Sequence, residues 1–150
     1  MNISAATTAD IAELCSLLDL LFSQEAEFKA DRTAQQRGLA MIINNPAIGD
    51  ILVARQDGEI IAMVNLLYSV STALGARVGI VEDMVVSPNA RGSGVGSKLL
   101  NYAIEFAKDK GCERLTLLTD NDNLAAQRFY QRHGFTQSSM IPLRIPLNKK

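Results

Sequence analysis

The sequence predicts an α/β fold, in which a mixed and mostly antiparallel sheet is flanked by about four helices. Residues 50–68 read as two strands joined by a tight turn, which supplies antiparallel pairing. An apolar stretch at residues 77–86 runs into a glycine-rich turn and then into an amphipathic helix. Another β-rich stretch follows that helix, and a strand that returns across a helix runs parallel to the strand before it.

Length and composition favour a single domain over residues 1–150. The chain is 47% hydrophobic and 21% charged, which is the balance of an ordinary globular protein. A chain of 150 residues can bury a core without a metal or a disulfide. Fifteen basic residues against sixteen acidic ones give a net charge of −1. We therefore expect no nucleic-acid partner, because a phosphate backbone is held by a basic surface.

The same sequence argues against a membrane protein and against a metal site. The N-terminus lacks the basic and apolar regions of a signal peptide, and no apolar run reaches about 18 residues, so we expect a cytoplasmic protein with no membrane partner. Cys15 and Cys112 lack a metal-binding spacing, and His133 is the only histidine. We expect two buried, reduced thiols and no metal, with a catalytic cysteine as the less favoured alternative.

The first part of the chain is predicted as an edge strand followed by two helices. Residues 2–6 suit a short edge strand, and side-chain oxygens at residues 7–10 can cap the first helix. Residues 23–32 are polar and are predicted as a loop. A second helix at residues 33–44 ends ahead of Pro46. The residues expected to face inward are Ile11, Leu14, Leu17, Leu18 and Leu21, then Leu39, Ile42 and Ile43.

A hairpin and a third long strand follow these helices. Residues 50–55 and 59–68 are rich in β-branched and aliphatic side chains, and the turn sequence QDG at residues 56–58 is typical of a hairpin. Residues 69–75 are predicted to turn the chain into the strand at residues 77–86. The nearly continuous apolar character of that strand indicates burial on both faces.

After the glycine-rich turn and its helix, the chain again alternates between strand and helix. Residues 113–119 are predicted as a strand parallel to the preceding one. Asn123 can cap a last helix at residues 124–133. From residue 135 onward we expect one or two C-terminal strands, broken by two prolines.

The segment IVEDMVVSPNARGSGVGSK at residues 80–98 is predicted to bind a phosphate. Three of the five residues from Gly92 to Gly96 are glycine, so the backbone can adopt positive φ and turn several N–H groups toward one anion. The helix that follows adds free N-terminal amides and the positive end of its dipole. Its apolar face consists of Val95, Leu99, Tyr102, Ala103 and Phe106.

The spacing excludes two common phosphate-binding motifs. A P-loop requires GxxxxGK, whereas Ser97 separates Gly96 from Lys98 here. A dinucleotide fingerprint requires GxGxxG, and counted from Gly92 its third glycine position is Ser97. The glycine-rich turn therefore belongs to another class of phosphate site.

Two further motifs occur in order, about thirty residues apart. The first is RxxGxG at residues 91–96, and the second is NxxAxxFY at residues 123–130, followed by GF at residues 134–135. Through both motifs, over residues 78–135, the chain resembles the GCN5-related N-acetyltransferase (GNAT) family.

This resemblance implies an acetyl-CoA site in a sheet that is splayed at a central parallel pair. The pantetheine arm would lie between the strand that ends at Val86 and the strand from residue 113. Backbone groups of Met84, Val85 and Val86 would bond its amides and the thioester oxygen. Asn123 would bond the pantetheine or act as a plain helix cap. The residues expected at the phosphates are Arg91, Gly92, Ser93, Gly94, Val95, Gly96 and Ser97.

The resemblance also implies transfer of the acetyl group to a primary amine, of a small molecule or a protein, by direct attack in a ternary complex. Tyr130 is the expected general acid for the CoA thiolate, because a phenol with a pKa near ~10 is protonated at neutral pH. The alternative for Tyr130 is a packing role. The competing function is a non-catalytic acyl-CoA-binding or sensing module of the same fold. A homodimer is compatible with either function.

Glu82 and Asp83 are the candidates for the base that takes the proton of the amine, with a water chain as the alternative. Regular alternation puts the two carboxylates on opposite faces of the strand, unless a bulge intervenes. We expect Glu82, on the face of Ile80, Met84 and Val86, to be the base. Asp83 is then its structural partner.

Two other sets of polar groups are weaker candidates. His133 precedes Gly134 at the end of a predicted helix, where an imidazole complements the helix dipole, so no catalytic role is expected. The polar residues Gln24, Glu25, Glu27 and Asp31 are predicted to form a solvated loop rather than an amine pocket.

Overall fold

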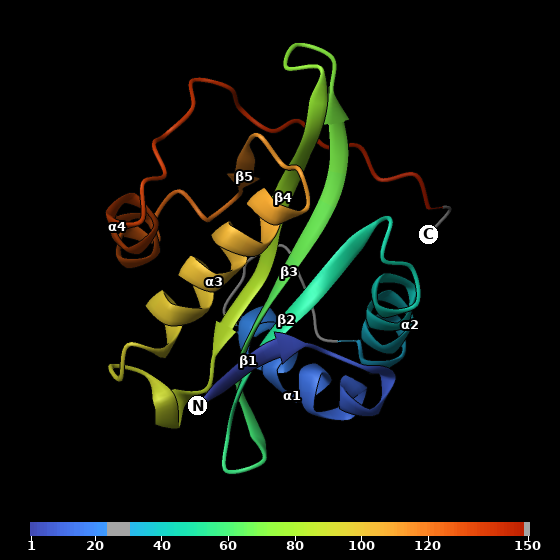
Figure 1. Cartoon of the computed structure of the whole chain (residues 1–150), viewed down its shortest axis with the longest axis vertical. Helices are drawn as coiled ribbons and strands as arrows, with labels where there is room; N and C mark the ends of the chain where they lie inside the picture. The colour runs from blue at the N-terminus through green and yellow to red at the C-terminus, as the bar shows by residue number, and fades with distance from the viewer. Residues whose placement is uncertain (24–30, 149–150) are drawn as a thin grey trace.

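The computed structural model describes residues 1–23 and 31–148, and a five-stranded sheet runs through it (Figure 1). The strands lie in the order β1-β2-β3-β4-β5. All neighbouring pairs are antiparallel except β4 and β5, which are parallel. The bounds are β1 Asn2–Ala5, β2 Gly49–Gln56, β3 Glu59–Ser71, β4 Ala76–Val86 and β5 Leu115–Leu117. The mixed, mostly antiparallel sheet predicted from the sequence is confirmed.

Helices cover both faces of this sheet. α1 (Ile11–Phe22) and α2 (Arg32–Ile43) lie on one face, and α3 (Val95–Asp109) lies on the other (Figure 1). α4 (Leu124–Arg132) lies beside the start of α3. Two 3-10 turns, Thr8–Asp10 and Pro88–Ala90, precede α1 and the glycine-rich turn.

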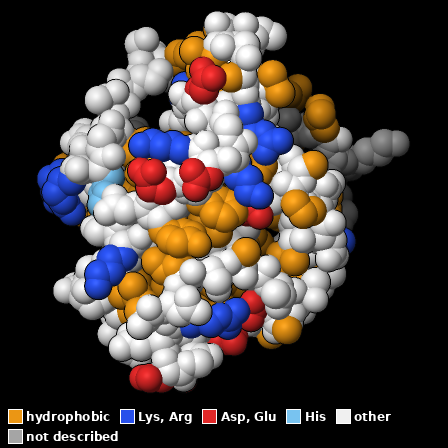
Figure 2. Space-filling view, viewed as in Figure 1, with side chains coloured by type: hydrophobic (Ala, Val, Ile, Leu, Met, Phe, Trp, Pro, Cys, Tyr) orange, Lys and Arg blue, Asp and Glu red, His pale blue; other side chains and the backbone are white. Residues whose placement is uncertain are grey.

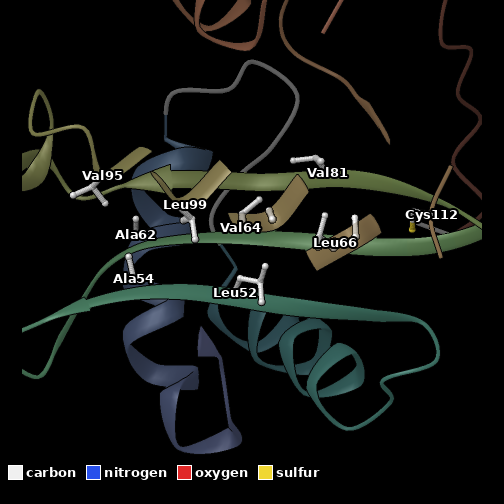
Figure 3. Close-up of a cluster of buried hydrophobic side chains, with 11 residues drawn as sticks. Leu52, Ala54, Ala62, Val64, Leu66, Val81, Val95, Leu99 and Cys112 are labelled. Atoms are coloured by element: carbon white, nitrogen blue, oxygen red, sulfur yellow. The ribbon is translucent and has the colours of Figure 1, made fainter. Parts of the chain in front are cut away.

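Each face of the sheet has its own apolar cluster. On one face, Leu14, Leu18 and Leu39 pack against Met63 and Val85. The helical spacing therefore predicted the buried side of α1 correctly. The cluster under α3 is drawn in Figure 3, where the labelled residues are Leu52, Ala54, Ala62, Val64, Leu66, Val81, Val95, Leu99 and Cys112.

The turns and caps form where local sequence chemistry favours them. Asp57 and Gly58 both have positive φ, 52° and 81°, as a two-residue hairpin turn between β2 and β3 requires. Asp31 caps α2, with its Oδ1 accepting a hydrogen bond from the Ala34 N–H at 3.2 Å. This bond pairs an N–H group in the first turn of α2 that has no acceptor within the helix.

A β-bulge interrupts β4 beside its acidic pair. Met63 of β3 lies opposite Val85, but Asn65 lies opposite Glu82, so one residue of β3 faces two residues of β4. Asp83, one of these two, has a φ of 53°. Aspartate tolerates this left-handed conformation better than most residues.

The bulge changes which face of the sheet each carboxylate occupies. Val81 packs under α3, whereas Val85 packs under α1 and α2, although regular alternation would put both on one face. Glu82 shares the face of Asn65, its cross-strand neighbour, and Asp83 bonds the side chain of Asn65. Both carboxylates therefore lie on the α1–α2 face, and the alternation expected from sequence is wrong at this point.

The parallel pair lies at the edge of the sheet rather than at its centre. β5 is the last strand in the sheet order, and it is shorter than the predicted strand at residues 113–119. It pairs with Gly79, Ile80 and Val81 only. Beyond Val81 the two strands are no longer paired, so the sheet is splayed where the resemblance predicted a cosubstrate site.

The expected C-terminal strands are absent from residues 134–148, the described part of that segment. Prolines at positions 142 and 146 have no N–H to donate, and the segment pairs with no edge of its own sheet. Its large apolar side chains are 77–90% exposed: Met140, Ile141, Leu143, Ile145 and Leu147. The strand prediction is therefore wrong for a single copy of the chain.

Three smaller expectations also need correction or confirmation. The turn predicted at residues 69–75 is shorter, because β3 continues to Ser71. Burial of both faces of β4 is only partly right: Ile80 is 36% exposed, since only the Val85 end of β4 packs in the cluster formed with α1 and α2. The prediction of two buried free thiols, Cys15 and Cys112, is confirmed.

The surface of the described chain carries no single-sign charge field on the face seen in Figure 2, where acidic and basic side chains are interspersed. Within residues 1–23 and 31–148, no helix is both long and apolar enough to span a membrane. No cluster of three or more potential metal ligands occurs in that same part of the chain.

Candidate active site

A cavity of about 540 Å³ opens where β4 ends and the glycine-rich turn begins. We call it the glycine-turn cavity, since the turn at residues 91–94, the first turn of α3 and one side of α4 form its walls. Of the residues predicted to contact acetyl-CoA, those that line it are Met84, Val85, Val86, Arg91, Gly92, Gly94, Val95, Gly96, Ser97 and Tyr130. One cavity thus brings together the two motifs singled out in the sequence.

Backbone amides make this cavity suited to an anion. The first hydrogen bond of α3 runs from the Lys98 N–H to the Gly94 carbonyl, at 3.1 Å, so the N–H groups of the three residues between them have no acceptor within the helix. Gly92 and Gly94 have φ of 80° and 83°, a conformation that other residues rarely adopt. Gly96 differs, since a Cβ there would meet Val86 and Phe129 at an ordinary 3.5 and 3.6 Å.

Two arginines, Arg91 and Arg132, line this cavity, whereas the predicted residue Ser93 does not. Arg91 donates from Nε to the Val86 carbonyl at 3.2 Å, and Arg132 lies over the ring of Phe129; both line the cavity. Ser93 bonds the Ala90 carbonyl through its hydroxyl. Ser93 does not line the cavity.

Asn123 acts as a helix cap in the described structure. Its Oδ1 accepts a hydrogen bond from the Ala126 N–H at 3.1 Å, and it does not line the glycine-turn cavity. The capping role predicted for it is confirmed. Its cap begins the helix that carries Tyr130.

Tyr130 stands on α4 with its ring enclosed by aromatic neighbours. Phe129 and Phe135 lie edge-on to it, with ring centroids 5.2 and 5.8 Å away. Burial raises the pKa of the Tyr130 hydroxyl to about 12. No group that the structure describes is hydrogen-bonded to this hydroxyl, and the side chain lines the cavity. It is therefore a neutral donor at physiological pH.

A second cavity of about 250 Å³ lies between α1, α2 and the sheet, and we call it the α1–α2 cavity. Leu18, Leu39 and Ile42 contribute apolar wall. Asp31 and Asp83 contribute carboxylates, at the start of α2 and at the bulge. The sequence analysis named Asp83 as a candidate base and placed Asp31 in a solvated loop rather than an amine pocket. It did not predict this cavity, because the lining comes from segments far apart along the chain.

Asp83 is the perturbed carboxyl group of this second cavity. Burial raises its pKa to about 6, the negative charge of Glu82 adds to the rise, and a hydrogen bond from Asn65 opposes it. That bond, from Nδ2 to Asp83 Oδ2, is 2.7 Å long. Glu82 is exposed and lines neither cavity. Of the two acidic neighbours, only Asp83 reaches a cavity.

The two cavities adjoin along β4 and the last turns of α1. Asp83 lines the α1–α2 cavity, and its neighbour Met84 lines the glycine-turn cavity. On α1, Phe22 lines the first and Leu21 the second. Residues adjacent in sequence therefore line different cavities, both at the bulge in β4 and at the end of α1.

The polar loop and His133 are the weaker candidates from the sequence. Gln24, Glu25 and Glu27, and most of the loop predicted at residues 23–32, lie outside the described residues. His133 bridges α4 to α3, through Ser97 Oγ at 3.1 Å and Asn101 Oδ1 at 3.0 Å. It therefore holds the two walls of the glycine-turn cavity together.

Comparison with known proteins agrees with this geometry. The profile of the Acetyltransferase (GNAT) family matches residues 11–135. An uncharacterized N-acetyltransferase of Bacillus subtilis, YhfO, is 32% identical over 143 residues, covering 93% of this chain and 92% of that protein. The aminoalkylphosphonate N-acetyltransferase of Salmonella typhimurium is 32% identical over 133 residues, covering 89% of this chain and 83% of that protein.

Solved structures agree in fold as well. A putative acetyltransferase from Agrobacterium tumefaciens has a TM-score of 0.82 and 26% identity, and the match covers 98% of this chain and all of that one. An acetyltransferase is thus favoured over a non-catalytic acyl-CoA-binding module. The family match, the two relatives and the shared fold together show that the chain belongs to the GNAT family of N-acetyltransferases, which use acetyl-CoA as cosubstrate.

Proposed function

We propose that the protein acetylates a primary amine by direct transfer, with acetyl-CoA in the glycine-turn cavity and the amine in the α1–α2 cavity. The observation that carries this proposal is the bulge at Asp83, where the two cavities adjoin. Direct attack needs both substrates at once and their reacting atoms in contact. Adjoining cavities on the two sides of one bulge satisfy that requirement.

The residues of the glycine-turn cavity suit the phosphates and the pantetheine arm. Free N–H groups at the start of α3 and the positive end of its dipole favour a bound anion. Arg91 and Arg132 supply two cations. On its β5 side, β4 is unpaired beyond Val81. Backbone groups of Met84, Val85 and Val86 are the proposed partners of the pantetheine amides and of the thioester oxygen, whose charge grows during transfer. The Val86 carbonyl would share this role with its bond from Arg91.

Asp83 is the base that we propose, in place of Glu82. Its carboxyl lines the cavity assigned to the amine, and its pKa of about 6 keeps it ionised at neutral pH yet makes it a stronger base than an ordinary aspartate. Glu82 is exposed outside both cavities, and its charge raises the pKa of Asp83. The bulge therefore supports the opposite assignment to the one based on regular alternation.

Tyr130 is the proposed proton donor to the CoA sulfur. Its raised pKa keeps the phenol neutral, so it can hydrogen-bond a sulfur that becomes a thiolate. An ammonium substrate loses two protons when it becomes an amide. One proton passes through Asp83 to solvent. As the carbon–nitrogen bond forms and the carbon–sulfur bond breaks, Tyr130 gives its proton to the sulfur, and the second proton of the amine replaces the one that Tyr130 has lost.

A CoA-release assay over a set of primary amines tests this proposal, together with thermal unfolding in the presence of acetyl-CoA. Acetyl-CoA is expected to raise the melting temperature more than NAD or ATP does, because only a ligand of the native state shifts the folding equilibrium. A larger shift with NAD, or acetyl-CoA binding without CoA release for any amine, would contradict it. The cytoplasmic location and the absence of nucleic-acid and membrane partners stay predictions from the sequence.

We also propose that the chain forms a homodimer through its C-terminal segment. Ile141, Leu143, Ile145 and Leu147 occupy alternate positions, so in a strand they share one face, while the ring nitrogens of both prolines point to one edge. Such a segment can pair through its other edge. The same chain offers β5 as an open sheet edge among its described residues.

A segment and an edge on one chain can satisfy each other in a closed two-fold pair, which is why a second copy is the proposed partner. Light scattering of the full chain is expected to give a dimer, and the double variant Leu143→Glu/Ile145→Glu a monomer. Val70→Glu, at a position that is 74% exposed on β3, is the matched control and should leave the dimer intact. A monomeric full chain would contradict the proposal.

A further inference from the structure

Two amide side chains line the α1–α2 cavity, Gln35 and Asn65. Both ends of the Gln35 amide are hydrogen-bonded within the chain, so Asn65 is the one with an unused group. It lies on β3 with only 2% of its surface exposed, and it lines the cavity beside Asp83. Its Nδ2 donates to Asp83 Oδ2 at 2.7 Å. Its Oδ1 is buried and has no hydrogen-bond partner among the described residues. Such an acceptor is costly to leave unpaired, so a buried one needs an explanation.

The Asp83 carboxylate determines which end of the Asn65 amide has no hydrogen-bond partner. A carboxylate only accepts hydrogen bonds, so the NH₂ group of Asn65 must face Asp83. The remaining Oδ1 can only accept, and it therefore needs a donor. An ammonium group carries three N–H donors. One can serve the Asp83 carboxylate, and a second can serve Asn65 Oδ1.

The rest of the lining describes the body of the ligand. Leu18, Phe22 and Leu39 are apolar, and Gly38 leaves space, since a Cβ there would meet no atom within 4 Å. The volume of about 250 Å³ lies just below the ~300–1,000 Å³ range of drug-sized sites. The charged side chains of the described lining are both carboxylates, Asp31 and Asp83. An anionic group on the ligand would meet like charge and no cation among these residues.

We infer that the acceptor is a compact primary amine with an apolar body and no anionic group, whose nitrogen is positioned by Asn65 Oδ1 beside Asp83. This inference rests on the proposed function, and it names the substrate class and a positioning residue for that site. It also separates this chain from its relative named for aminoalkylphosphonates. Within the described lining, the charged groups that a phosphonate near the amine would meet are the carboxylates Asp31 and Asp83.

The first test is a matched acceptor series with the wild-type protein. 2-Phenylethylamine and 3-methylbutylamine are compared with 2-aminoethylphosphonate and β-alanine, all at saturating acetyl-CoA. The apolar amines are expected to have kcat/KM at least tenfold higher. A preference for the phosphonate or the carboxylate would overturn the inference and leave acetyl transfer standing. If neither class is acetylated, the proposed function fails, and the inference fails with it.

The second test separates positioning by Asn65 from a purely structural role. Asn65→Leu has a similar volume but no acceptor, so KM for 2-phenylethylamine is expected to rise at least tenfold. The melting-temperature shift caused by acetyl-CoA should stay as in wild type. A change in folding alone would leave KM for the amine unchanged in the folded fraction, and that result would overturn the role.

A conservative variant covers the case in which Asn65→Leu does not fold. Asn65→Asp keeps an acceptor oxygen, so KM for 2-phenylethylamine should stay within threefold of wild type. It also puts a second carboxylate against Asp83, and the acid limb of the pH profile should therefore move to higher pH. An unmoved profile together with a raised KM would contradict the assigned geometry.

Discussion

Backbone groups shape the glycine-turn cavity, whereas side chains shape the α1–α2 cavity. Main-chain N–H groups and the conformations of Gly92 and Gly94 shape the first. Side chains of two helices and two strands shape the second, and its two central groups, Asn65 and Asp83, touch only because a bulge brings them together. A backbone site depends on a few consecutive residues, whereas a side-chain site depends on how distant segments pack.

This contrast explains why the two halves of one active site differ in how they can change. A substitution in the glycine turn has to respect left-handed backbone conformations, so few residues are tolerated there. A substitution at Gly38, where a Cβ would meet no atom within 4 Å, alters the shape of the α1–α2 cavity without straining the backbone. Acceptor choice can therefore vary while the cosubstrate site stays the same.

Asp83→Asn is expected to have the largest effect. Loss of the base should lower kcat/KM by about 10³ at pH 7.5, within the range for general acid–base catalysis. In the wild type, kcat/KM should fall below about pH 6, where the Asp83 carboxyl takes up a proton. Glu82→Gln is the matched control, one residue away but outside both cavities. If that control loses the activity instead, Glu82 is the base.

Tyr130→Phe changes the glycine-turn cavity on the other side of the bulge. It should lower kcat about 10²-fold, because the donor hydroxyl is lost, while the ring and its packing stay. The acetyl-CoA dissociation constant, measured by calorimetry, should change little. Tyr102→Phe, on the half-exposed face of α3, tests whether loss of any nearby phenol has this effect. Wild-type turnover in Tyr130→Phe would leave Tyr130 as a packing residue.

The raised pKa of Asp83 also predicts a gain in stability for Asp83→Asn. The folded protein holds this proton up to about pH 6, whereas the unfolded chain releases it near the ordinary value of 3.8. The wild type therefore loses free energy of unfolding as pH rises between these values. At pH 7.5 the variant should be more stable by about 3 kcal/mol in urea unfolding, and the difference should shrink toward pH 4. A variant less stable at pH 7.5 would contradict the burial of the charge.

Gly94→Ala should show the smallest of these effects and mark the backbone site. The methyl group disfavours the left-handed φ of 83° at the start of α3, so the acetyl-CoA dissociation constant should rise about tenfold, or about 1.4 kcal/mol. Gly58→Ala is the matched control, with a φ of 81° in the distant β2–β3 turn. Both variants should lose similar stability. Equal acetyl-CoA affinity in the two would remove the turn from the site.

Some features of the two cavities could be predicted from neighbouring residues alone. Local sequence predicted the hairpin at Asp57-Gly58, the Asn123 cap of α4, the glycine turn and its family motif, since each depends on the conformations open to a few adjacent residues. The glycine turn could be predicted as an anion site for that reason, whereas Met84, Val85, Val86 and Tyr130 were predicted from the resemblance to the family. Arg132 was missed, because nothing in the motif spacing distinguishes it from other basic residues of α4.

Only the tertiary structure decided the acceptor half of the site. The position of the bulge follows from how β3 pairs with β4, and a shift of one residue moves a side chain to the other face of a sheet. The pairing of Asn65 with Asp83 and the enclosure of both by α1 and α2 are contacts between segments far apart in sequence. The C-terminal strands failed for a related reason: a strand forms only beside a partner edge, and residues 134–148 pair with no edge within one copy of the chain.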